Sequence, residues 1–168
     1  MNVVLVRQGE KYSPKYVDIL IKLCEKYAGK TPITLTDQID TSGKTSEMKS
    51  GYTGFWAKTE LLAPWQEHLR PCLYIDLDTI ILKPIHDFFI ETDELWLIRD
   101  FYNPERSNSG LMILPKNTDE LWANSLKWTK DKADGNFLTT QPHRILQDHF
   151  EGIKSYKAHW DHQMARIC

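Results

Sequence analysis

Cysteine is scarce in this chain, and its positions suit neither a disulfide framework nor a zinc site. Cys24, Cys72 and Cys168 are an odd number of thiols, widely separated, without a Cys-x-x-Cys pair. The sequence also lacks an Asn-x-Ser/Thr glycosylation site. These absences indicate reduced thiols in a reducing compartment, and we expect a cytoplasmic protein.

Long apolar runs and an excess of charge of one sign are absent as well. No run approaches the roughly 18 apolar residues of a membrane-spanning helix, and the N-terminus has no signal-peptide pattern. The 21 Lys and Arg residues nearly balance the 23 Asp and Glu residues, which leaves a net charge of −2. We therefore expect no transmembrane segment and no nucleic-acid partner.

What the chain does contain is an ordinary globular composition, with 41% hydrophobic and 26% charged residues in a length of 168. That length predicts a single domain over residues 1–168. Apolar patterning predicts a strand over 3–7, a helix over 14–28 and a strand over 33–36, which together form a right-handed βαβ unit. Composition and patterning thus indicate an α/β fold.

Ligands of such sheets bind at the carboxyl ends of the strands. Arg7, Tyr12 and Asp37 lie at or just past the ends of the two predicted strands. We consider them candidate ligand contacts, although residues of these types also serve as surface ion pairs and loop caps.

The most informative stretch is Leu73–Lys83, an apolar run with Asp76 and Asp78 in its middle. Apolar, β-branched residues predict a strand buried on both faces. In an extended chain residues i and i+2 point to one side, so the two carboxylates can converge on one object. A hard divalent cation, which prefers carboxylate oxygens, is the simplest such object.

Two other interpretations of the pair are weaker. Asp-x-Asp also occurs in solvated turns and at helix N-termini, but such turns rarely have apolar residues on both flanks. The phosphatase pattern Asp-x-Asp-x-Thr requires threonine at the position of Ile80, whereas Thr79 stands one residue early. We therefore set the phosphatase aside.

Further elements follow from patterning, capping and turn signals. Lys58 stands among apolar neighbours, so it is either directed at a phosphate or an ordinary lysine whose stem covers apolar surface. The predicted elements up to residue 114 are a polar loop over 38–54, a helix over 55–62, a strand over 95–99 ending in Asp100, a polar turn over 103–110 and a strand over 111–114. A helix follows from a capping box at 117–120 to about 135, with Leu121, Trp122, Ser125 and Leu126 directed inward. The last predicted elements are a helix over about 143–150 and a strand over 153–156.

Taken in order, these motifs resemble the GT-A glycosyltransferases, particularly small bacterial and viral proteins of the glycogenin and galactosyltransferase branch. The motifs that carry the resemblance are the opening strand with Gly9 and Tyr12, the strand ending in Asp37, Gly54–Lys58, Tyr74–Asp78, Ser107–Gly110 and Ser155–Lys157. The resemblance covers nearly the whole chain and implies a GT-A fold, a Rossmann-like mixed sheet of six or seven strands flanked by helices.

The resemblance also implies roles for single residues. Asp76 and Asp78 would hold Mn²⁺ (or Mg²⁺) against the diphosphate of a nucleotide-sugar donor. Lys58 would reach the diphosphate or the sugar, and Asn108 and Ser109 would position the transferred sugar. Asp100, Asn108 and Gln141 are the candidate catalytic residues. Val6, Arg7, Tyr12 and Asp37 would contact the base and ribose.

Two positions of the family are not matched. A late Asp-Gln pair corresponds to Thr140-Gln141, so its carboxylate is missing or is supplied by Asp148. Relatives end with a metal-binding Phe-His-Gly segment, and this sequence stops at Cys168, about where that segment would begin. Three explanations remain: truncation, replacement of the ligand by His159 or His162, or weaker metal binding.

From the resemblance we expect a metal-dependent hexosyltransferase that uses a nucleotide sugar, with UDP as carrier and retention of anomeric configuration favoured, and an unidentified carbohydrate or other small acceptor. Two alternatives are a catalytically impaired nucleotide-binding or scaffold relative and a sugar nucleotidyltransferase. The second needs a Gly-rich triphosphate loop, of which Gln8–Lys11 is a poor version.

Overall fold

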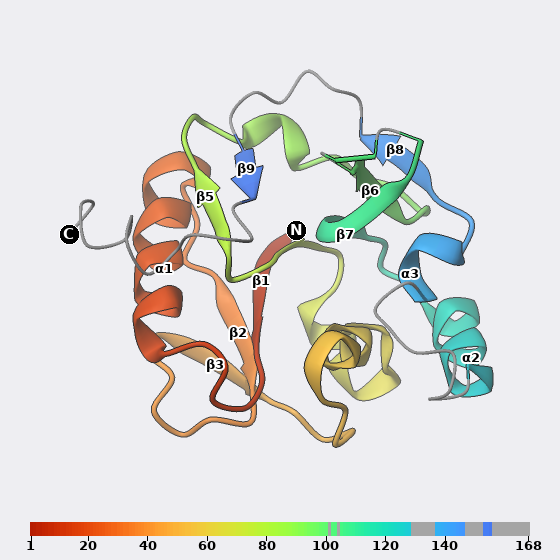
Figure 1. Ribbon diagram of the computed structural model, residues 1–168, viewed down its shortest axis with the longest axis horizontal. Coiled ribbons are helices and arrows are strands. Elements are labelled where there is room, and N and C mark those ends of the chain that lie inside the picture. The colour runs from red at the N-terminus through yellow and green to blue at the C-terminus, as the bar shows by residue number, and fades with distance from the viewer. Residues whose placement is uncertain (101, 104, 129–136, 147–152, 156–168) are drawn as a thin grey trace.

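The computed structural model describes residues 1–100, 102–103, 105–128, 137–146 and 153–155, and they form a mixed sheet flanked by helices (Figure 1). Its elements are β1 (Asn2–Arg7), α1 (Pro14–Ala28), β2 (Ile33–Thr36), β3 (Lys44–Glu47), the 3₁₀ helices η1 (Gly54–Leu62) and η2 (Pro64–Leu69), β4 (Cys72–Ile75), β5 (Thr79–Ile81), η3 (His86–Phe88), β6 (Trp96–Arg99), β7 (Ser107–Leu114), α2 (Asp119–Lys127), α3 (Phe137–Thr140), β8 (Arg144–Leu146) and β9 (Ile153–Ser155).

Within the described residues, seven strands form the main sheet in the order β3-β2-β1-β4-β7-β6-β8, and β5 pairs with β9 in a separate antiparallel pair. The strands β1 to β4 in this sheet are parallel, whereas β7 is antiparallel to both of its neighbours, β4 and β6. The opening βαβ unit and the α/β sheet of six or seven strands predicted from the sequence are therefore confirmed.

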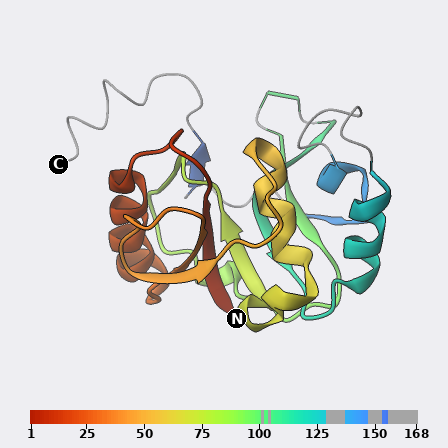
Figure 2. The same ribbon diagram turned by 90° about the horizontal axis from the view of Figure 1, so that it is seen from below.

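Side-chain alternation along the central strands divides the core into two layers. Val3, Leu5 and Leu73 belong to the layer that packs against α1. Val4 and Tyr74 belong to the layer on the other face, with residues of η1, η2 and α3. Figure 2 shows η1 and η2, in gold and yellow, between the red and orange N-terminal elements and the cyan α2.

Helix α1 follows the signals in its sequence. Pro14 occupies the first turn, and Gly29 ends the helix in the left-handed conformation with φ of 63°. Val17, Leu20 and Cys24 are buried at helical spacing. Burying each large aliphatic side chain contributes about 1.5–3 kcal/mol, so this face holds the helix on the sheet. Cys24 and Cys72 are free buried thiols, as predicted.

The predicted single strand over Leu73–Lys83 is wrong. It is divided into β4 and β5 by a turn at Asp76–Asp78, in which the Thr79 N–H donates to the Asp76 carbonyl at 3.1 Å. The turn interpretation, which we considered weaker, is therefore right about the backbone, yet the turn is only partly exposed to solvent, because Leu77 is 3% exposed. The apolar run continues past the turn because β5 is buried in a second sheet.

Other predicted boundaries also need correction. The loop over 38–54 contains the edge strand β3, and 107–110 opens β7 instead of closing a turn. Helix α2 ends at Lys127, not near 135, because Trp128 is extended, and Leu126 is 62% exposed rather than inward. The helix predicted from 143 is replaced by β8 at 144–146, with its remainder outside the described residues.

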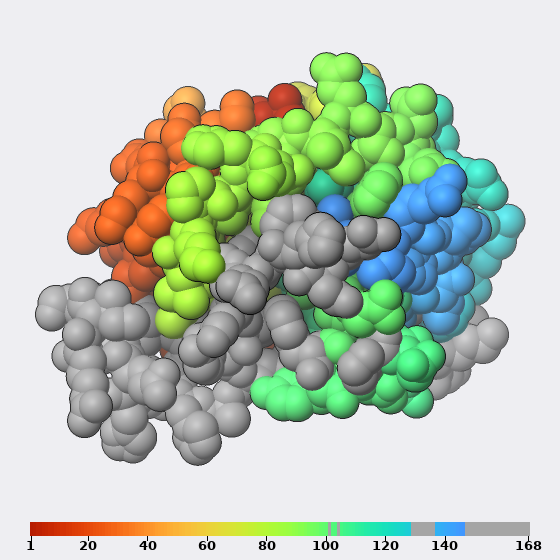
Figure 3. All heavy atoms as spheres, turned by 90° about the horizontal axis from the view of Figure 1, so that it is seen from above, coloured from red at the N-terminus to blue at the C-terminus, as the bar shows by residue number. Residues whose placement is uncertain are grey.

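On one face of the molecule, the green segment that contains β5 and η3 lies between the orange N-terminal elements and the blue β8 segment (Figure 3). Among the residues that the structure describes, no helix has both the length and the apolar character needed to cross a membrane.

Glu60 fixes η1, the helix that carries Lys58. Its carboxylate is fully buried and accepts hydrogen bonds from the N–H groups of Lys49 and Ser50 at 2.6 and 2.9 Å. The Trp65 indole and the Gln66 amide donate to the same carboxylate at 3.1 and 3.0 Å. Burial alone would raise the pKa of Glu60, but hydrogen bonds from the Ser50 hydroxyl, from the N–H groups of Ser50 and Lys49 and from the Gln66 amide outweigh it, and the pKa is lowered.

We predict that Glu60→Gln lowers the free energy of unfolding by about 2–4 kcal/mol at pH 7, because a buried amide cannot accept all these bonds. Since the pKa of Glu60 is depressed in the folded chain, its contribution is present above the ordinary glutamate value of 4.5 and is lost as the pH falls below it. The difference between wild type and variant in urea titrations should therefore shrink in acid. Glu67→Gln, at an exposed carboxylate, is the control, and an equal effect of both changes would contradict this role.

Candidate donor-sugar and metal site

The strand directions bring the predicted site residues to one edge of the sheet. Because β1, β2 and β4 are parallel, their carboxyl ends meet at one edge, and antiparallel β7 begins there. Strand β6 is antiparallel to β7, so its carboxyl end lies at this edge too. The residues placed there are Arg7, Asp37, Asp76, Asp100 and Asn108. The predicted positions of Arg7, Asp37 and Asp100 at strand ends are confirmed, whereas Asp76 was predicted in the middle of a strand and Asn108 in a turn.

Asp76 is the most constrained of the carboxylates. Its Oδ1 accepts a hydrogen bond from Lys58 Nζ at 2.8 Å and another from the hydroxyl of Tyr74. Its backbone N–H donates to the Gly110 carbonyl at 2.8 Å, which ties the end of β4 to β7. The side chain of Lys58 is 8% exposed and that of Asp76 is 26% exposed. Lys58 is therefore a buried cation paired with Asp76, not a lysine whose stem merely covers the surface.

A second chain of contacts joins Asp100, Asn108 and Gly110. Asn108 Nδ2 donates to Asp100 Oδ2 at 3.2 Å, and Asn108 Oδ1 accepts from the Gly110 N–H at 2.7 Å. These partners fix which end of the amide faces which neighbour. The other oxygen of Asp100 accepts the N–H groups of Tyr102 and Asn103 at 2.8 and 3.0 Å, so Asp100 orders both its loop and Asn108.

Tyr12 connects the first loop to the second carboxylate. Its hydroxyl donates to Asp78 Oδ2 at 3.4 Å. Burial, followed by the charges of Asp78 and Asp76, holds the pKa of Tyr12 well above its ordinary value. Lys11 Nζ lies 5.0 Å from the Tyr12 ring and 5.5 Å from the ring of exposed Phe55. The β1–α1 loop thus reaches both the Asp76–Asp78 turn and the start of η1.

The remaining nucleotide candidates make contacts within the protein. The Arg7 guanidinium donates to Asp40 at 2.5 Å and to Thr41 at 2.8 Å. Asp37 accepts from the Gly9 N–H at 2.9 Å and the Gln8 amide at 3.1 Å. Burial would raise the pKa of Asp37, but these bonds and one from Gln38 lower it. Both residues organise the loops after β1 and β2.

The other predicted residues are distributed as follows. Val6 is half-buried in β1, and the Ser109 carbonyl accepts from Lys58 Nζ at 3.1 Å. Gln141 bonds to Asn124 of α2 at 3.2 Å and to the Phe137 carbonyl at 3.3 Å, so the described contacts join it to α2 and α3 instead of the turn at Asp76. Asp148, Tyr156, Lys157, His159 and His162 lie outside the described residues.

Two residues of the site, Tyr74 and Gly110, were not identified from the sequence. Tyr74 precedes Asp76 by two residues, so strand alternation could have placed both on one face. Gly110 permits a close approach that a side chain would prevent, because a Cβ there would lie 2.9 Å from Asn108 Oδ1 and 3.2 Å from Asp76 Oδ2. The requirement for glycine arises from pairing between β4 and β7, and no local pattern shows it.

The donor set fits a hard divalent cation. Within the described residues, no group of three His, Cys, Asp or Glu side chains is placed to hold a metal ion. Mg²⁺ in phosphate-binding sites nevertheless needs only one or two carboxylates, with substrate phosphates and water completing its shell. Asp76 Oδ2, which lies beside Gly110, and the carboxylate of Asp78 are oxygen donors of the required kind.

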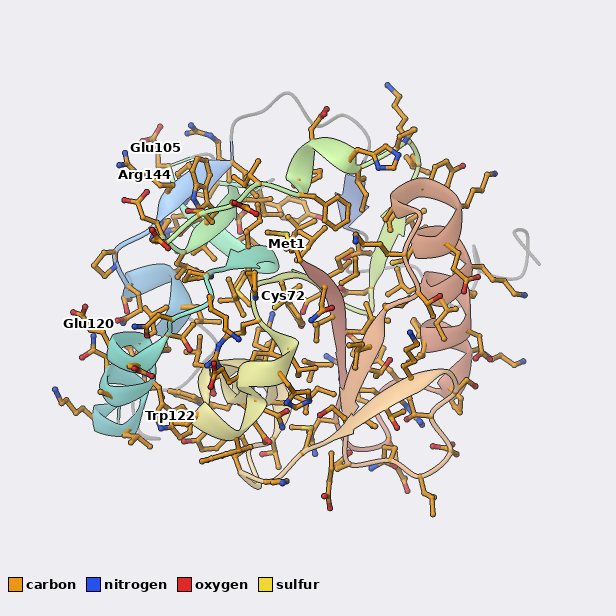
Figure 4. The ribbon with its side chains drawn as sticks, turned by 180° about the vertical axis from the view of Figure 1, so that it is seen from behind. Met1, Cys72, Glu105, Glu120, Trp122 and Arg144 are labelled. Carbon is orange, nitrogen blue, oxygen red and sulfur yellow. The ribbon has the colours of Figure 1, made fainter. Side chains whose placement is uncertain are left out.

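A separate cavity of about 710 Å³ opens at the opposite edge, where β7 ends and β6 and β8 begin. Its lining includes Asp93, Glu94, Glu120 and Arg144. Figure 4 shows Glu120 and Arg144 on this side of the molecule, with Trp122 extending from α2 toward η1 and η2. Arg144 pairs with Glu94 at 2.8 Å. No sequence pattern predicts this cavity.

No protein-family profile and no curated protein sequence match this chain. Solved structures do. The glycosyltransferase GlyE of Streptococcus pneumoniae TIGR4 superposes with a TM-score of 0.62 at 15% identity, over 99% of this chain and 50% of GlyE. In its apo form GlyE gives a TM-score of 0.59 at 17% identity, over 89% of this chain and 46% of that one. The chain thus spans about half the length of GlyE.

Two further glycosyltransferases share the arrangement. The galactosyltransferase LgtC, in complex with donor and acceptor sugar analogues, has a TM-score of 0.60 at 12% identity, over 86% of this chain and 73% of LgtC. A glycosyltransferase involved in glycosylation of the major capsid of PBCV-1 has a TM-score of 0.53 at 12% identity, over 87% and 80%. The chain therefore has the fold of the GT-A glycosyltransferases, as its ordered motifs predict.

Proposed function

We propose that the chain transfers a hexose from a nucleotide sugar, with UDP as the carrier, to a carbohydrate or other small acceptor. The observation that carries this proposal is the joint placement of Asp76, Asp78 and Asn108 at the carboxyl edge of a GT-A sheet. Ligands of open α/β sheets bind at this edge. The likeness to glycosyltransferases supports the fold on which the proposal rests.

Asp76 and Asp78 would hold Mn²⁺ or Mg²⁺ there. A bound divalent cation neutralises the charge that develops on a departing nucleoside diphosphate. Each remaining group has a task that its contacts allow. Tyr12 holds Asp78, and the Asn108 amide, fixed by Asp100 and Gly110, presents hydrogen-bonding atoms to sugar hydroxyls.

A second candidate is a relative that binds the nucleotide without transferring the sugar. It is favoured by the position of Gln141, whose described contacts join it to α2 and α3, and by the two-carboxylate donor set within the described residues. The two candidates differ in turnover, not in nucleotide binding.

The first prediction concerns nucleotide binding. In calorimetry with Mn²⁺, UDP should bind the wild type with a Kd on the order of micromolar, and omission of the metal should weaken binding at least about tenfold. Asp76→Asn and Asp78→Asn should each cause a comparable loss because the charged oxygens are removed. The matched control is Asp93→Asn, at the opposite edge, which should bind UDP as the wild type does. Metal-independent binding would contradict the assignment of the carboxylates.

The second prediction separates the two candidates. Incubation with UDP-hexoses and Mn²⁺ should release UDP, with hydrolysis by water reporting turnover when no acceptor is present. Release that disappears in Asp76→Asn would support transfer. If the chain binds UDP but releases no UDP from any of the UDP-hexoses, the binding relative would be favoured. Pyrophosphate release from UTP and a sugar phosphate would instead establish a nucleotidyltransferase.

The third prediction concerns the close approach of Gly110 to the side-chain oxygens of Asn108 and Asp76. Gly110→Ala should weaken Mn²⁺-dependent UDP binding about tenfold or more, because the new Cβ displaces Asn108 Oδ1 or Asp76 Oδ2. Overpacking should also lower the free energy of unfolding by about 1–3 kcal/mol. Ser107→Ala, three residues earlier in the same strand, is the control and should change both quantities little. Normal UDP binding by Gly110→Ala would show that the close approach at Gly110 is not needed for the site.

A further inference from the structure

The geometry points to Tyr74, acting with Lys58, as a positioning residue that fixes Asp76 so that a divalent cation binds through its Oδ2 alone. This inference rests on the proposed function and deepens it. Neither residue needs to contact the metal or the donor, because both act on the other oxygen of the carboxylate.

The sheet places Tyr74 and Asp76 on the same face. They are two residues apart at the end of β4, and the Tyr74 ring belongs to the core layer that includes residues of η1. Tyr74 is 2% exposed, so its ring is held by packing. Its hydroxyl meets Asp76 Oδ1 at a distance set by the strand and the core, and a hydroxyl buried in this way needs an acceptor.

Lys58 approaches the same oxygen from η1. Its Nζ lies 2.8 Å from Asp76 Oδ1, 3.1 Å from the Ser109 carbonyl and 5.0 Å from the centre of the Tyr74 ring. These three contacts satisfy a buried ammonium group through a carboxylate, a carbonyl and an aromatic face. Turning Lys58 toward a diphosphate would break all three. Lys58 is therefore a fixed internal partner of Asp76, in contrast to the phosphate contact that the sequence suggests.

The two oxygens of Asp76 consequently have different tasks. Oδ1 accepts two strong donors, which occupy its lone pairs. Oδ2 lies beside Gly110, where a Cβ would approach it to 3.2 Å. The Asp76 N–H, bound to the Gly110 carbonyl, holds the backbone of the residue in register. Side chains that hydrogen-bond to a metal ligand in this way commonly change metal affinity 10- to 100-fold when they are removed.

The test uses Tyr74→Phe, which keeps the packed ring and removes only the hydroxyl. Mn²⁺ binding to the whole chain, without nucleotide, is followed by electron paramagnetic resonance of the free ion. We expect Tyr74→Phe to weaken Mn²⁺ binding about 10- to 100-fold. Tyr27→Phe on α1, on the opposite face of the sheet, is the matched control and should bind as the wild type does. A Tyr74→Phe variant with wild-type Mn²⁺ affinity would overturn the inference.

A double-mutant cycle on the metal-free chain tests the contact itself. Tyr74→Phe should raise the equilibrium constant of unfolding about tenfold in the wild-type background. In an Asp76→Ala background, where the hydroxyl has lost its acceptor, the same change should have little effect or the opposite sign. Equal effects in both backgrounds would show that Tyr74 does not orient Asp76.

The two measurements separate the inference from the proposed function. If the wild type binds Mn²⁺ in a manner that depends on Asp76 while Tyr74→Phe binds it equally well, the metal site stands and the positioning role is wrong. If the wild type binds no Mn²⁺ through Asp76, the metal-dependent function and the single-oxygen binding mode are both wrong. The cycle then reports only whether Tyr74 holds Asp76.

Discussion

The site depends on one interaction, the convergence of Lys58 and Tyr74 on a single oxygen of Asp76. A carboxylate that is three-quarters buried at the end of a strand is costly unless it is paired and hydrogen-bonded. Lys58 supplies the opposite charge, and Tyr74 supplies a donor that the core holds in place. The same contacts join η1, β4 and β7, because Lys58 also binds the carbonyl of Ser109. The electrostatic requirement of one side chain therefore fixes the relative positions of three elements.

Strand direction accounts for the rest of the site. An antiparallel β7 between β4 and β6 places the beginning of one strand beside the ends of its neighbours. Asn108, near the start of β7, thereby comes to the edge where Asp76 and Asp100 follow their strands. Gly110 allows the close approach of the two chains at that point. Sheet topology, more than any single motif, assembles the candidate site.

The sequence predicts those features that local patterns control. The opening βαβ unit, the stop of α1 at Gly29 and the buried strand that leads to Asp76 are all visible in spacing and turn chemistry. The break between β4 and β5 is not, because apolar residues buried in a second sheet look the same as a continuing strand. Strand β3 escaped detection because it is an exposed edge strand with no apolar alternation.

Contacts between residues far apart in the sequence determine the features that the sequence did not predict. The pairing of Lys58 with Asp76 depends on a contact across 18 residues, and the helical pattern of η1 does not show which way the lysine turns. Strand β8, only three residues long, is stabilised by pairing with β6 and carries no period of its own. Capping signals before α2 locate its start, but no local signal marks its end at Lys127, after which Trp128 is extended.

The most direct test of this account is anomalous diffraction at the manganese edge from crystals of the chain grown with UDP and Mn²⁺. We predict a single strong peak in contact with Asp76 Oδ2 and the Asp78 carboxylate, with Lys58 still bound to Asp76 Oδ1 and the diphosphate on the far side of the ion. A peak in the cavity beside Asp93 and Glu94, or a diphosphate bound by Lys58 without manganese, would contradict it.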